Sequence, residues 1–282
     1  MEKAIRKYWP IFVLPTLLAF IFGFIIPFVE GVYLAFCQFT TVKDATFIGL
    51  SNFTKVFADS TFTHAFWYNC AFVVVSTLVI NAGGLAVALI LTKAIRGTNA
   101  FRTVFFMPNL IGGIVLGYIW QILLNCALSL LEKPLLRLDA TAGFWGLVIL
   151  MAWQQIGYMM IIYVAGLQSI PRELYEAAEL DGAGLWKKYV FITVPALRPA
   201  TYYVMVNMII GSFNVFIQVM MLTGGNPNGK TSALQYLLYD RAFNQFEFGA
   251  ASALGLIPAV TIVAITFMLN RRLRLDDVEK EG

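Results

Sequence analysis

Six long apolar stretches constrain this chain more than any other feature of its sequence. They cover residues 10–37, 66–92, 104–126, 143–168, 199–222 and 248–270. The last five contain no Asp, Glu, Lys or Arg, and the first contains only Glu30. A helix needs about 20 mostly apolar residues to cross the hydrocarbon core of a bilayer. The pattern therefore predicts an all-α membrane protein, a polytopic bundle of about six transmembrane helices.

The overall composition agrees with a chain that faces lipid. Charged residues make up 13% of the 282 residues and hydrophobic residues 59%, whereas soluble domains contain about 25% charged and about 45–50% apolar residues. The 24 Phe, 12 Tyr and 6 Trp suit a lipid-facing surface with aromatic belts. The formal net charge of +4 is modest, and nucleic acid is not expected as a partner. Cys37, Cys70 and Cys126 lie too far apart to indicate a metal site or a disulfide framework.

The basic residues set an orientation for the predicted bundle, because cytoplasmic loops carry an excess of Lys and Arg. If successive connections alternate between the two sides, 14 of the 20 basic residues fall on the side that holds both termini. The other side holds Lys43, Lys55, Lys133, Arg137, Lys230 and Arg241. We therefore expect a multi-pass protein of the plasma membrane with both termini in the cytoplasm. We expect a single domain over 1–282, with its core at 66–270.

The inner connection 169–198 is polar, yet it is rich in helix signals. Pro171 suits a first helical turn, acidic residues and alanines follow, and Gly182 can end a helix because glycine accepts a positive φ. We expect a short amphipathic helix, a turn at 182–184, and a second helical piece that enters the membrane near Pro195–Pro199.

Within this connection, residues 176–195 read EAAELDGAGLWKKYVFITVP. This segment resembles the EAA loop of permease subunits of binding-protein-dependent ABC importers. The resemblance lies in Glu-Ala-Ala and in the distances from it to Gly182, Ile192 and Pro195. The family pattern has Leu where this chain has Val194. In that family the loop is a coupling helix that docks on a cytoplasmic ATPase. The coupling residues that the resemblance implies are Glu176, Ala177, Ala178, Gly182, Ile192 and Pro195.

Further stretches resemble the carbohydrate-uptake branch of this family, which includes the maltose and glycerol-phosphate permeases. They are AIRGTNAFRTVFFMP at 94–108 and the region 213–250, which includes TGGNPNGKT and LLYDRAF and leads into FGAASA. The resemblance implies that the chain forms half of the translocation pathway for a sugar or oligosaccharide. Its implied partners are a second, distinct permease subunit, a dimer of cytoplasmic ATP-binding subunits, an extracytoplasmic solute-binding protein and membrane lipid. ATP and Mg²⁺ would belong to the ATPase subunits, so we expect no cofactor and no enzymatic activity in this chain.

One segment matches a phosphate-binding pattern outside its usual context. Residues 224–231 fit G-x-x-x-x-G-K-T. A functional phosphate loop follows a strand and opens a helix, so that backbone N–H groups surround the phosphates. This segment follows an apolar stretch and lies on the outer side by the charge count, so we do not expect it to bind ATP.

Uncharged polar side chains recur at helical spacing in three of the predicted spans. Such residues are costly in the membrane unless they face a cavity or a neighbouring helix. Amides can bond sugar hydroxyl groups, and aromatic rings can cover the apolar faces of a sugar. The candidates for the solute pathway are Asn207, Asn214 and Gln218 in the fifth span, Tyr118, Gln121 and Asn125 in the third, and Gln154 and Tyr158 in the fourth. Hydrogen bonding between spans is the alternative role.

Two other classes of function are disfavoured. An ion-coupled secondary transporter usually carries ionisable residues near the middle of the membrane, and the predicted spans have none there. A membrane enzyme would need a nucleophile, an acid/base pair or a metal cluster near a bilayer face, and no such set stands out. Within the importer class, another small polar solute, such as a polyol phosphate or a polyamine, stays an alternative.

Overall fold

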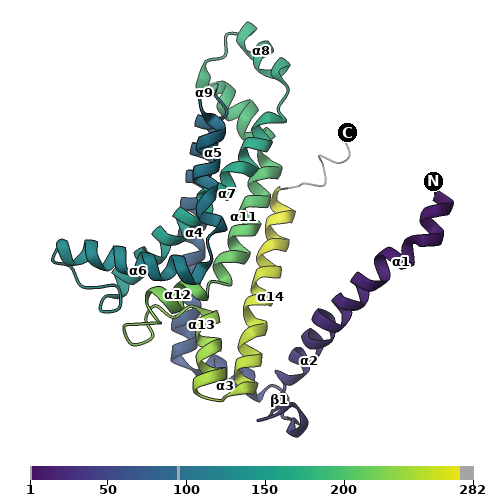
Figure 1. Ribbon diagram of the computed structural model, residues 1–282, viewed down its shortest axis with the longest axis vertical. Coiled ribbons are helices and arrows are strands. Elements are labelled where there is room, and N and C mark those ends of the chain that lie inside the picture. The colour runs from purple at the N-terminus through teal and green to yellow at the C-terminus, as the bar shows by residue number, and fades with distance from the viewer. Residues whose placement is uncertain (1, 94–95, 274–282) are drawn as a thin grey trace. The chain divides into compact units, whose positions relative to one another are not determined.

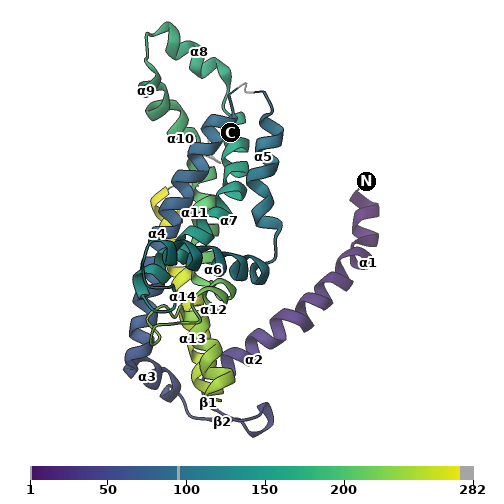
Figure 2. The same cartoon turned by 60° about the vertical axis from the view of Figure 1, so that its left-hand side comes forward.

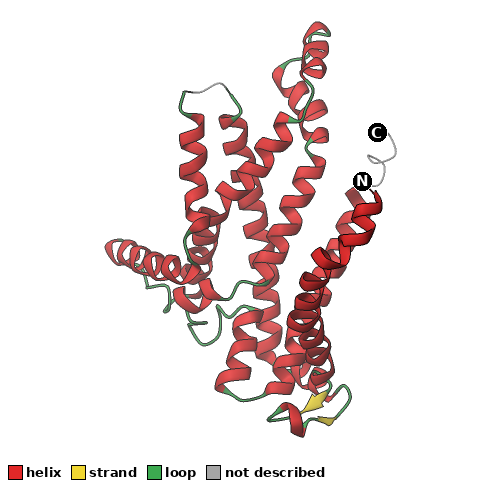
Figure 3. Ribbon diagram, turned by 45° about the vertical axis from the view of Figure 1, so that its right-hand side comes forward, coloured by secondary structure: helices red, strands yellow, loops and turns green. Residues whose placement is uncertain are grey.

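The computed structural model describes residues 2–93 and 96–273, and most of them are helical (Figure 1). The chain divides into two compact units: Met1–Ser60 with Leu238–Ala259, and Thr61–Leu237 with Val260–Gly282. Strand structure among the described residues is confined to one short pair (Figure 3). The expected all-α fold is therefore confirmed. A single functional domain over 1–282, with its core at 66–270, stays a prediction.

The first unit begins with a long apolar helical rod. It comprises α1 (Glu2–Phe20), the π-helical turn η1 (Ile21–Ile25) and α2 (Ile26–Leu34). Phe20, Phe24 and Phe28 lie four residues apart and hence on one face, where their rings stack with centroid separations of 5.2 and 6.0 Å. No side chain of 11–34 is buried within the chain itself, so this apolar surface is open to lipid or to another subunit.

The rest of the first unit folds around a buried asparagine. Its elements are β1 (Cys37–Gln38), the 3₁₀ turn η2 (Val42–Asp44), β2 (Thr46–Phe47), α3 (Ser51–Ala58), the π-helical turn η5 (Asp240–Asn244) and the start of α14 (Phe248–Leu273). The strands pair antiparallel, with Cys37 opposite Phe47. Asn52 Nδ2 donates to the carbonyl oxygens of Ala35 and Cys37 at 3.0 and 2.8 Å. Gly249 of α14 reaches the same place because it has no side chain: an added Cβ would lie 2.5 Å from the Cys37 oxygen.

The second unit contains the remaining helices. They are α4 (Ser60–Leu91), α5 (Thr98–Phe106), η3 (Met107–Leu110), α6 (Gly113–Leu130), α7 (Ala140–Gln168), α8 (Arg172–Leu180), α9 (Leu185–Lys188), η4 (Tyr189–Thr193), α10 (Val194–Ala196), α11 (Arg198–Phe213), α12 (Ile217–Leu222) and α13 (Leu234–Tyr239). In Figures 1 and 2, α4, α5, α7 and α11 run roughly side by side, whereas α6 lies across them.

Helix α7 is the centre of the second unit. Leu147, Met160 and Tyr163 of α7 are buried together with Ile80 of α4 and Val204 of α11. Of the candidate spans, α7 has the largest buried share, 61% of its most apolar window. Its sequence is uniformly apolar rather than amphipathic, as expected for a helix that is surrounded on most sides.

Small residues allow the helices of this unit to approach closely. An added Cβ on Gly84 of α4 would lie 3.2 Å from the Met159 Cβ on α7. At Gly157 of α7 the approach is closer still, because an added Cβ would overlap the backbone carbonyl of Phe105 on α5. Such glycines are common where membrane helices pack, since packing rather than hydrophobicity drives association in lipid.

Five helices of the described chain are long and apolar enough to cross a membrane. They are Ile11–Leu34, Ser60–Leu91, Gly113–Leu130, Ala140–Gln168 and Phe248–Arg271. The first, second, fourth and sixth predicted spans correspond to four of these helices. The third and fifth predicted spans, 104–126 and 199–222, are not continuous helices.

The two interruptions differ in their local geometry. In 104–126, Pro108 has no N–H to donate, and Ile111 and Gly112 take extended backbone with ψ of 132° and 135°, so the chain turns from α5 into α6. In 199–222, α11 ends at Asn214, whose Nδ2 donates to the Ile210 oxygen at 2.9 Å. Asn207 makes the same bond to the Tyr203 oxygen within the continuous helix, so this bond alone does not end α11. The backbone leaves helical geometry at Asn214, with ψ 14°, and at Phe216, with φ −127°. Helix α12 then begins after Phe216.

Candidate functional site: the coupling loop and the polar residues of the bundle

The segment 169–198, here called the coupling loop, contains the short helix α8, at the end of the second unit that also carries α9 and α10 (Figure 2). Pro171 stands at the N-cap position, directly before the first helical residue, with φ −58° and ψ 134°. The expectation that it occupies the first turn is therefore wrong by one residue. Because proline has no N–H, it costs the start of the helix no hydrogen bond. The predicted helix itself is confirmed.

The end of α8 is a complete glycine cap. Gly182 has φ +72°, the left-handed region that glycine adopts without steric cost. The Ala183 N–H donates to the Ala178 oxygen at 2.8 Å, and the Gly182 N–H donates to the Glu179 oxygen at 3.0 Å. This pair of bonds is the Schellman pattern, which satisfies carbonyl groups left free at a helix end. The direction in which the chain leaves α8 is thus set by Gly182.

Two side-chain bonds hold α8 against the segment that follows it. Lys188 Nζ lies 2.7 Å from Glu179 Oε1. Tyr175 Oη and Thr193 Oγ1 are 2.8 Å apart, and Thr193 is buried. The Lys188–Glu179 bond spans the turn after α8. The Tyr175–Thr193 bond joins α8 to η4, which continues through α10 towards α11. The loop is therefore tied to the helix that enters the bundle.

The coupling loop presents a surface that the chain itself does not cover. Leu180 is 91% exposed and Trp186 is 74% exposed, and Leu174 and Leu185 are exposed as well. Glu176 and Ala177 are exposed, whereas Ala178 is half-buried. Large apolar side chains exposed among charged residues and two alanines are typical of a surface that another protein covers.

The remaining motif residues connect the loop to the bundle. Ile192 lies in η4 and Pro195 in α10, and both are half-buried. Leu197, two residues further on, is buried at Gly166 of α7, where an added Cβ would lie 3.0 Å from Leu197 Cδ2. A displacement of α8 would thus act directly on α11 and α7.

The polar residues predicted for the fifth span do not share one helix face. The break after Asn214 separates Asn207 on α11 from Gln218 on α12, so the predicted stripe is wrong in this respect. Asn207 Nδ2 donates within its own helix, to the Tyr203 oxygen at 3.0 Å. Asn214 Oδ1 accepts from Gln235 Nε2 at 2.9 Å, and Gln218 Nε2 donates to Gln154 Oε1 at 3.2 Å. The structure brings Gln154 and Gln218 together, and it pairs Asn214 with an amide that the spacing did not indicate.

The candidates on α6 mostly bond the backbone of neighbouring segments. Gln121 Nε2 donates to the Leu222 oxygen at 3.3 Å, and Asn125 Oδ1 accepts from the Leu136 N–H at 3.0 Å. Tyr118 is exposed. Tyr158 lies on α7 with its ring 6.3 Å from that of Phe106. The geometry of Gln121 and Asn125 fits hydrogen bonding between segments.

One buried polar cluster was missed from the sequence. Asn69 of α4 is fully buried, donates to the Ser212 oxygen at 3.4 Å and accepts from the Leu234 N–H at 3.1 Å. Ser76, seven residues along the same helix face, contacts the Ser212 hydroxyl at 3.0 Å. The i, i+7 spacing of two polar residues in a charge-free helix is the signal that could have found this cluster.

The segment that resembles a phosphate loop has a different structure. It follows helix α12 rather than a strand. Several of its N–H groups are already bonded: Gly224 donates to the Val219 oxygen of α12 at 2.8 Å and Lys230 to the Pro227 oxygen at 2.9 Å. The buried Thr231 hydroxyl donates to the Asn226 oxygen at 2.6 Å. These groups are not free to surround a phosphate. Among the described residues, no group of three or more His, Cys, Asp or Glu side chains could hold a metal ion.

These features define a polytopic α-helical membrane protein that binds a partner. Its apolar helices pack through glycines. Its capped amphipathic helix exposes leucines and a tryptophan, as a surface for another protein does. The family described as "Binding-protein-dependent transport system inner membrane component" matches residues 7–275. The chain belongs to this family, and it is a permease subunit of an ABC transport system.

Similar proteins agree with this assignment. The chain is 35% identical over 272 residues to the probable starch degradation products transport system permease protein AmyD of Thermoanaerobacterium thermosulfurigenes, with 92% of this chain and 91% of that protein covered. It is 31% identical to the sn-glycerol-3-phosphate transport system permease protein UgpA of Agrobacterium fabrum, with 90% of both chains covered. The fold matches a chain of a bacterial ABC transporter involved in the import of the acidic polysaccharide alginate, with a TM-score of 0.82, 21% identity, and coverage of 97% and 98%.

Proposed function

We propose that the chain forms half of the translocation pathway of an importer for a sugar or oligosaccharide, and that separate ATPase subunits drive it through α8. The observation that carries the proposal is the uncovered surface of the coupling loop on a helix whose end is rigidly capped at Gly182. The starch-product permease supports the choice of a saccharide, because its similarity extends over 92% of this chain.

The proposed docking gives the motif residues separate roles. Glu176 would pair with a basic side chain of the ATPase, and Ala177 and Ala178 would allow close approach. An exposed ion pair contributes about 0–1 kcal/mol, whereas truncating one member of a desolvated pair costs about 2–5 kcal/mol. Gly182 would set the direction of the helix, and Ile192 and Pro195 would pass its displacement to α11 as a rigid-body movement.

The proposal includes further partners that this chain does not contain. A second permease subunit, expected to be a distinct chain, would complete the pathway, and an extracytoplasmic binding protein would deliver the solute, as the family description suggests. ATP and Mg²⁺ would be bound by the ATPase dimer, so this chain would need no cofactor.

Both termini and the coupling loop would face the cytoplasm, because 14 of the 20 basic residues lie on their side. The orientation can be tested with single cysteines at Asn226 and Lys187, in a background that lacks Cys37, Cys70 and Cys126. An impermeant thiol reagent should label intact cells only at Asn226. Labelling of Lys187→Cys in sealed cells would contradict the orientation and with it the docking site.

The amide pairs would line the solute pathway in at least one state of the transporter. Gln154 with Gln218 and Asn214 with Gln235 offer hydrogen-bond donors and acceptors next to apolar helices. Tyr118 and Tyr158 offer aromatic rings three and four residues along the chain from Gln121 and Gln154. Replacing Asn214 by Leu should lower uptake while the complex stays assembled. Failure to assemble would instead assign Asn214 to packing, and unchanged uptake would remove it from the pathway.

A polyol phosphate is the second candidate solute, because the glycerol-phosphate permease is 31% identical to this chain. The described spans carry no basic residue that would attract a phosphate at mid-depth, which favours the neutral saccharide. Competition in an uptake assay separates the two: unlabelled maltotriose should displace a labelled saccharide, and sn-glycerol-3-phosphate should not.

The whole proposal can be tested by purifying the chain with its partners from the native host. We expect an ATPase subunit, a second permease and a solute-binding protein to co-purify, and we expect maltotriose to stimulate ATP hydrolysis in reconstituted vesicles. Gly182→Asp should impair this stimulation more than Glu176→Gln, because it adds a charge at the docking surface as well as a side chain in a left-handed turn. Wild-type coupling by Gly182→Asp, with the ATPase still bound, would refute the role of the loop.

A further inference from the structure

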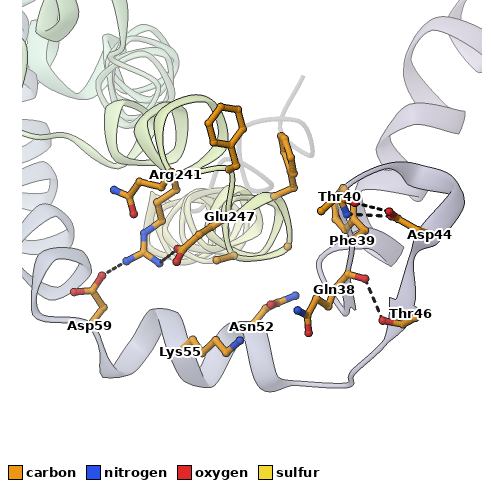
Figure 4. A pocket seen from close by; sticks show the side chains of 15 residues that line it. Gln38, Phe39, Thr40, Asp44, Thr46, Asn52, Lys55, Asp59, Arg241 and Glu247 are labelled. Carbon is orange, nitrogen blue, oxygen red and sulfur yellow. Dashed lines mark hydrogen bonds and ion pairs between the residues drawn. The ribbon is translucent and has the colours of Figure 1, made fainter.

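The first unit contains a polar cavity that neither the coupling loop nor the amide pairs use. It has a volume of about 840 Å³ and lies between α3, the β1–β2 hairpin and the junction of η5 with α14. Figure 4 shows Arg241 between Asp59 and Glu247, with Lys55, Asn52 and Gln38 also around the cavity. This volume is within the range of small-molecule sites, about 300–1,000 Å³.

Arg241 is the most deeply placed charge of the cavity. It is 7% exposed, and its guanidinium pairs with Asp59 and lies 3.3 Å from Glu247 Oε2. Its Nε is buried and has no hydrogen-bond partner within the described residues. A buried N–H without a partner is costly.

The charges that line the cavity nearly cancel. Asp44, Asp59 and Glu247 are opposed by Lys55 and Arg241. A hydrogen bond from the Thr40 hydroxyl, with further bonds from the Thr41 backbone, lowers the pKa of Asp44, so this carboxylate stays ionised at neutral pH. A site of this composition offers hydrogen bonds of both kinds and attracts no strongly charged ligand.

Aromatic rings complete the wall of the cavity. The rings of Phe39 and Phe248 are stacked with centroids 5.9 Å apart, and the Phe246 and Phe248 centroids are 6.3 Å apart. Phe246 is 69% exposed and has φ +58°. A bulky residue in the left-handed region is strained, and such strain concentrates at functional sites. The Phe246 ring is not fixed by burial, and a role in binding a ligand would explain why an aromatic residue stands at this strained position.

We propose that this cavity is a saccharide subsite on the permease itself, in which the Phe246 ring covers the apolar face of a neutral sugar whose hydroxyl groups bond Arg241, Lys55 and Gln38. The assignment rests on the proposed function, that is, on a saccharide as solute and on an outward position of the loops around Lys55 and Arg241. The subsite would receive sugar at the outer end of the pathway, before it enters the membrane. Its three carboxylates against two basic groups leave a slight negative excess, which selects neutral sugars over uronates.

The test uses the importer complex in lipid nanodiscs, without its extracytoplasmic binding protein, and the probe is maltotriose. Saturation-transfer NMR should detect saturable binding. Phe246→Gly should weaken binding by about tenfold through loss of ring contact, while the Tm stays equal or rises because glycine relieves the left-handed strain. Lys55→Met should weaken binding too. Phe243→Ala, an exposed ring outside the cavity, should bind as the wild type does.

The outcomes separate this inference from the proposed function. ATP-driven maltotriose uptake by the complete importer, measured in parallel, tests the solute class. Uptake without saturable binding, or wild-type binding by Phe246→Gly, overturns the subsite and leaves the importer assignment in place. Equal competition by trigalacturonate overturns the neutral-sugar assignment. A third outcome would assign the cavity to a protein contact instead. In this outcome Phe246→Gly binds maltotriose as the wild type does, but it loses the uptake that the binding protein supports.

Discussion

The coupling loop and the polar interior of the bundle are stabilised over different ranges of the chain. In the loop, the bond between Tyr175 and Thr193 joins residues 18 apart, and the Schellman bonds are shorter in sequence still. In the bundle, Gln218 bonds Gln154 across 64 residues, and Asn69 accepts from Leu234 across 165 residues. The loop can therefore keep its own shape as a unit, whereas the polar contacts of the bundle depend on how the whole second unit packs.

This difference predicts two kinds of defect. Changes in the loop should uncouple ATP hydrolysis from transport while the complex remains assembled. Changes at the helix contacts of the bundle should reduce assembly and transport together.

Gly157→Leu should have the largest effect, and it should act on assembly. An added side chain on α7 meets the backbone carbonyl of Phe105, which cannot rotate away as a side chain can. We expect a loss of stability of about 3 kcal/mol or more, seen as aggregated protein in size-exclusion chromatography. Gly211→Ala on α11 is the matched control, because its Cβ would meet nothing nearer than Met151 Cε at 3.8 Å. A monodisperse, fully active Gly157→Leu variant would show that the α5–α7 contact is unimportant.

Gly182→Val should uncouple the importer without affecting assembly. A Cβ at this position meets no atom within 4 Å, so the effect comes only from the positive φ, which costs a β-branched residue about 1–2 kcal/mol. We expect several-fold lower solute-stimulated ATP hydrolysis with all subunits retained on purification. Gly182→Asn is the control, since asparagine tolerates left-handed backbone. Equal activity of the two variants would show that the positive φ of residue 182 is not required for coupling.

Tyr175→Phe should have a smaller effect of the same kind. It removes the hydroxyl that meets Thr193 Oγ1 at 2.8 Å and leaves the ring in place. A bond of this type contributes about 0.5–1.5 kcal/mol. We expect fewer solute molecules transported per ATP, with little change in Tm. The opposite pattern, a lower Tm with normal stoichiometry, would assign the bond to folding rather than to transmission.

The Gln154–Gln218 pair can be measured by a double-mutant cycle with leucine substitutions. Interhelical hydrogen bonds of membrane proteins contribute about 0.6 kcal/mol on average, so the coupling energy for stability should be of this order. If the pair also lines the pathway, each single variant should lower uptake more than its stability loss explains. Uptake that follows stability in all three variants would restrict the pair to packing.

Glu179→Gln should have the smallest effect. The ion pair with Lys188 spans 2.7 Å, but the Glu179 side chain is mostly exposed. An exposed pair contributes about 0–1 kcal/mol and is screened by salt. We expect a slight loss of coupling at low ionic strength and none at high ionic strength, measured as ATP hydrolysis in a salt series. A large, salt-independent defect would mean that Glu179 is itself covered by the ATPase.

Features that depend on local sequence could be predicted, whereas features that depend on contacts between distant segments could not. The apolar helices and the end of α8 depend on local properties, namely long uncharged stretches and a glycine where the chain must take a positive φ, and both were predicted. The break after Asn214 was not, because Asn207 and Asn214 share one local pattern, an amide in an apolar run that bonds the carbonyl four residues back, and only Asn214 lies at a helix end. Gln235 was likewise missed as the partner of Asn214, since nothing in their spacing brings two segments together across a turn.

The EAA pattern located the loop but could not indicate how it is held. Tyr175, Thr193 and Lys188 have no special spacing in the sequence, and their roles depend on the path of the chain after Gly182. The cavity around Arg241 depends on two segments more than 180 residues apart in sequence, since Arg241 and Asp59 are separated by 182 residues. Charge counting placed these residues on one side of the membrane and gave no indication that they meet.

Cross-linking from a cysteine on α8 can establish whether this helix docks on an ATPase subunit. A single cysteine introduced as Glu176→Cys, in a chain that lacks Cys37, Cys70 and Cys126, should cross-link to the ATPase in the assembled importer with a reagent that joins a maleimide to a photoreactive benzophenone, because the benzophenone inserts into C–H bonds and needs no thiol on the ATPase. Asn226→Cys should give no such product. No cross-link from Glu176→Cys in a complex that retains its ATPase, or an equal yield from Asn226→Cys, would contradict the account.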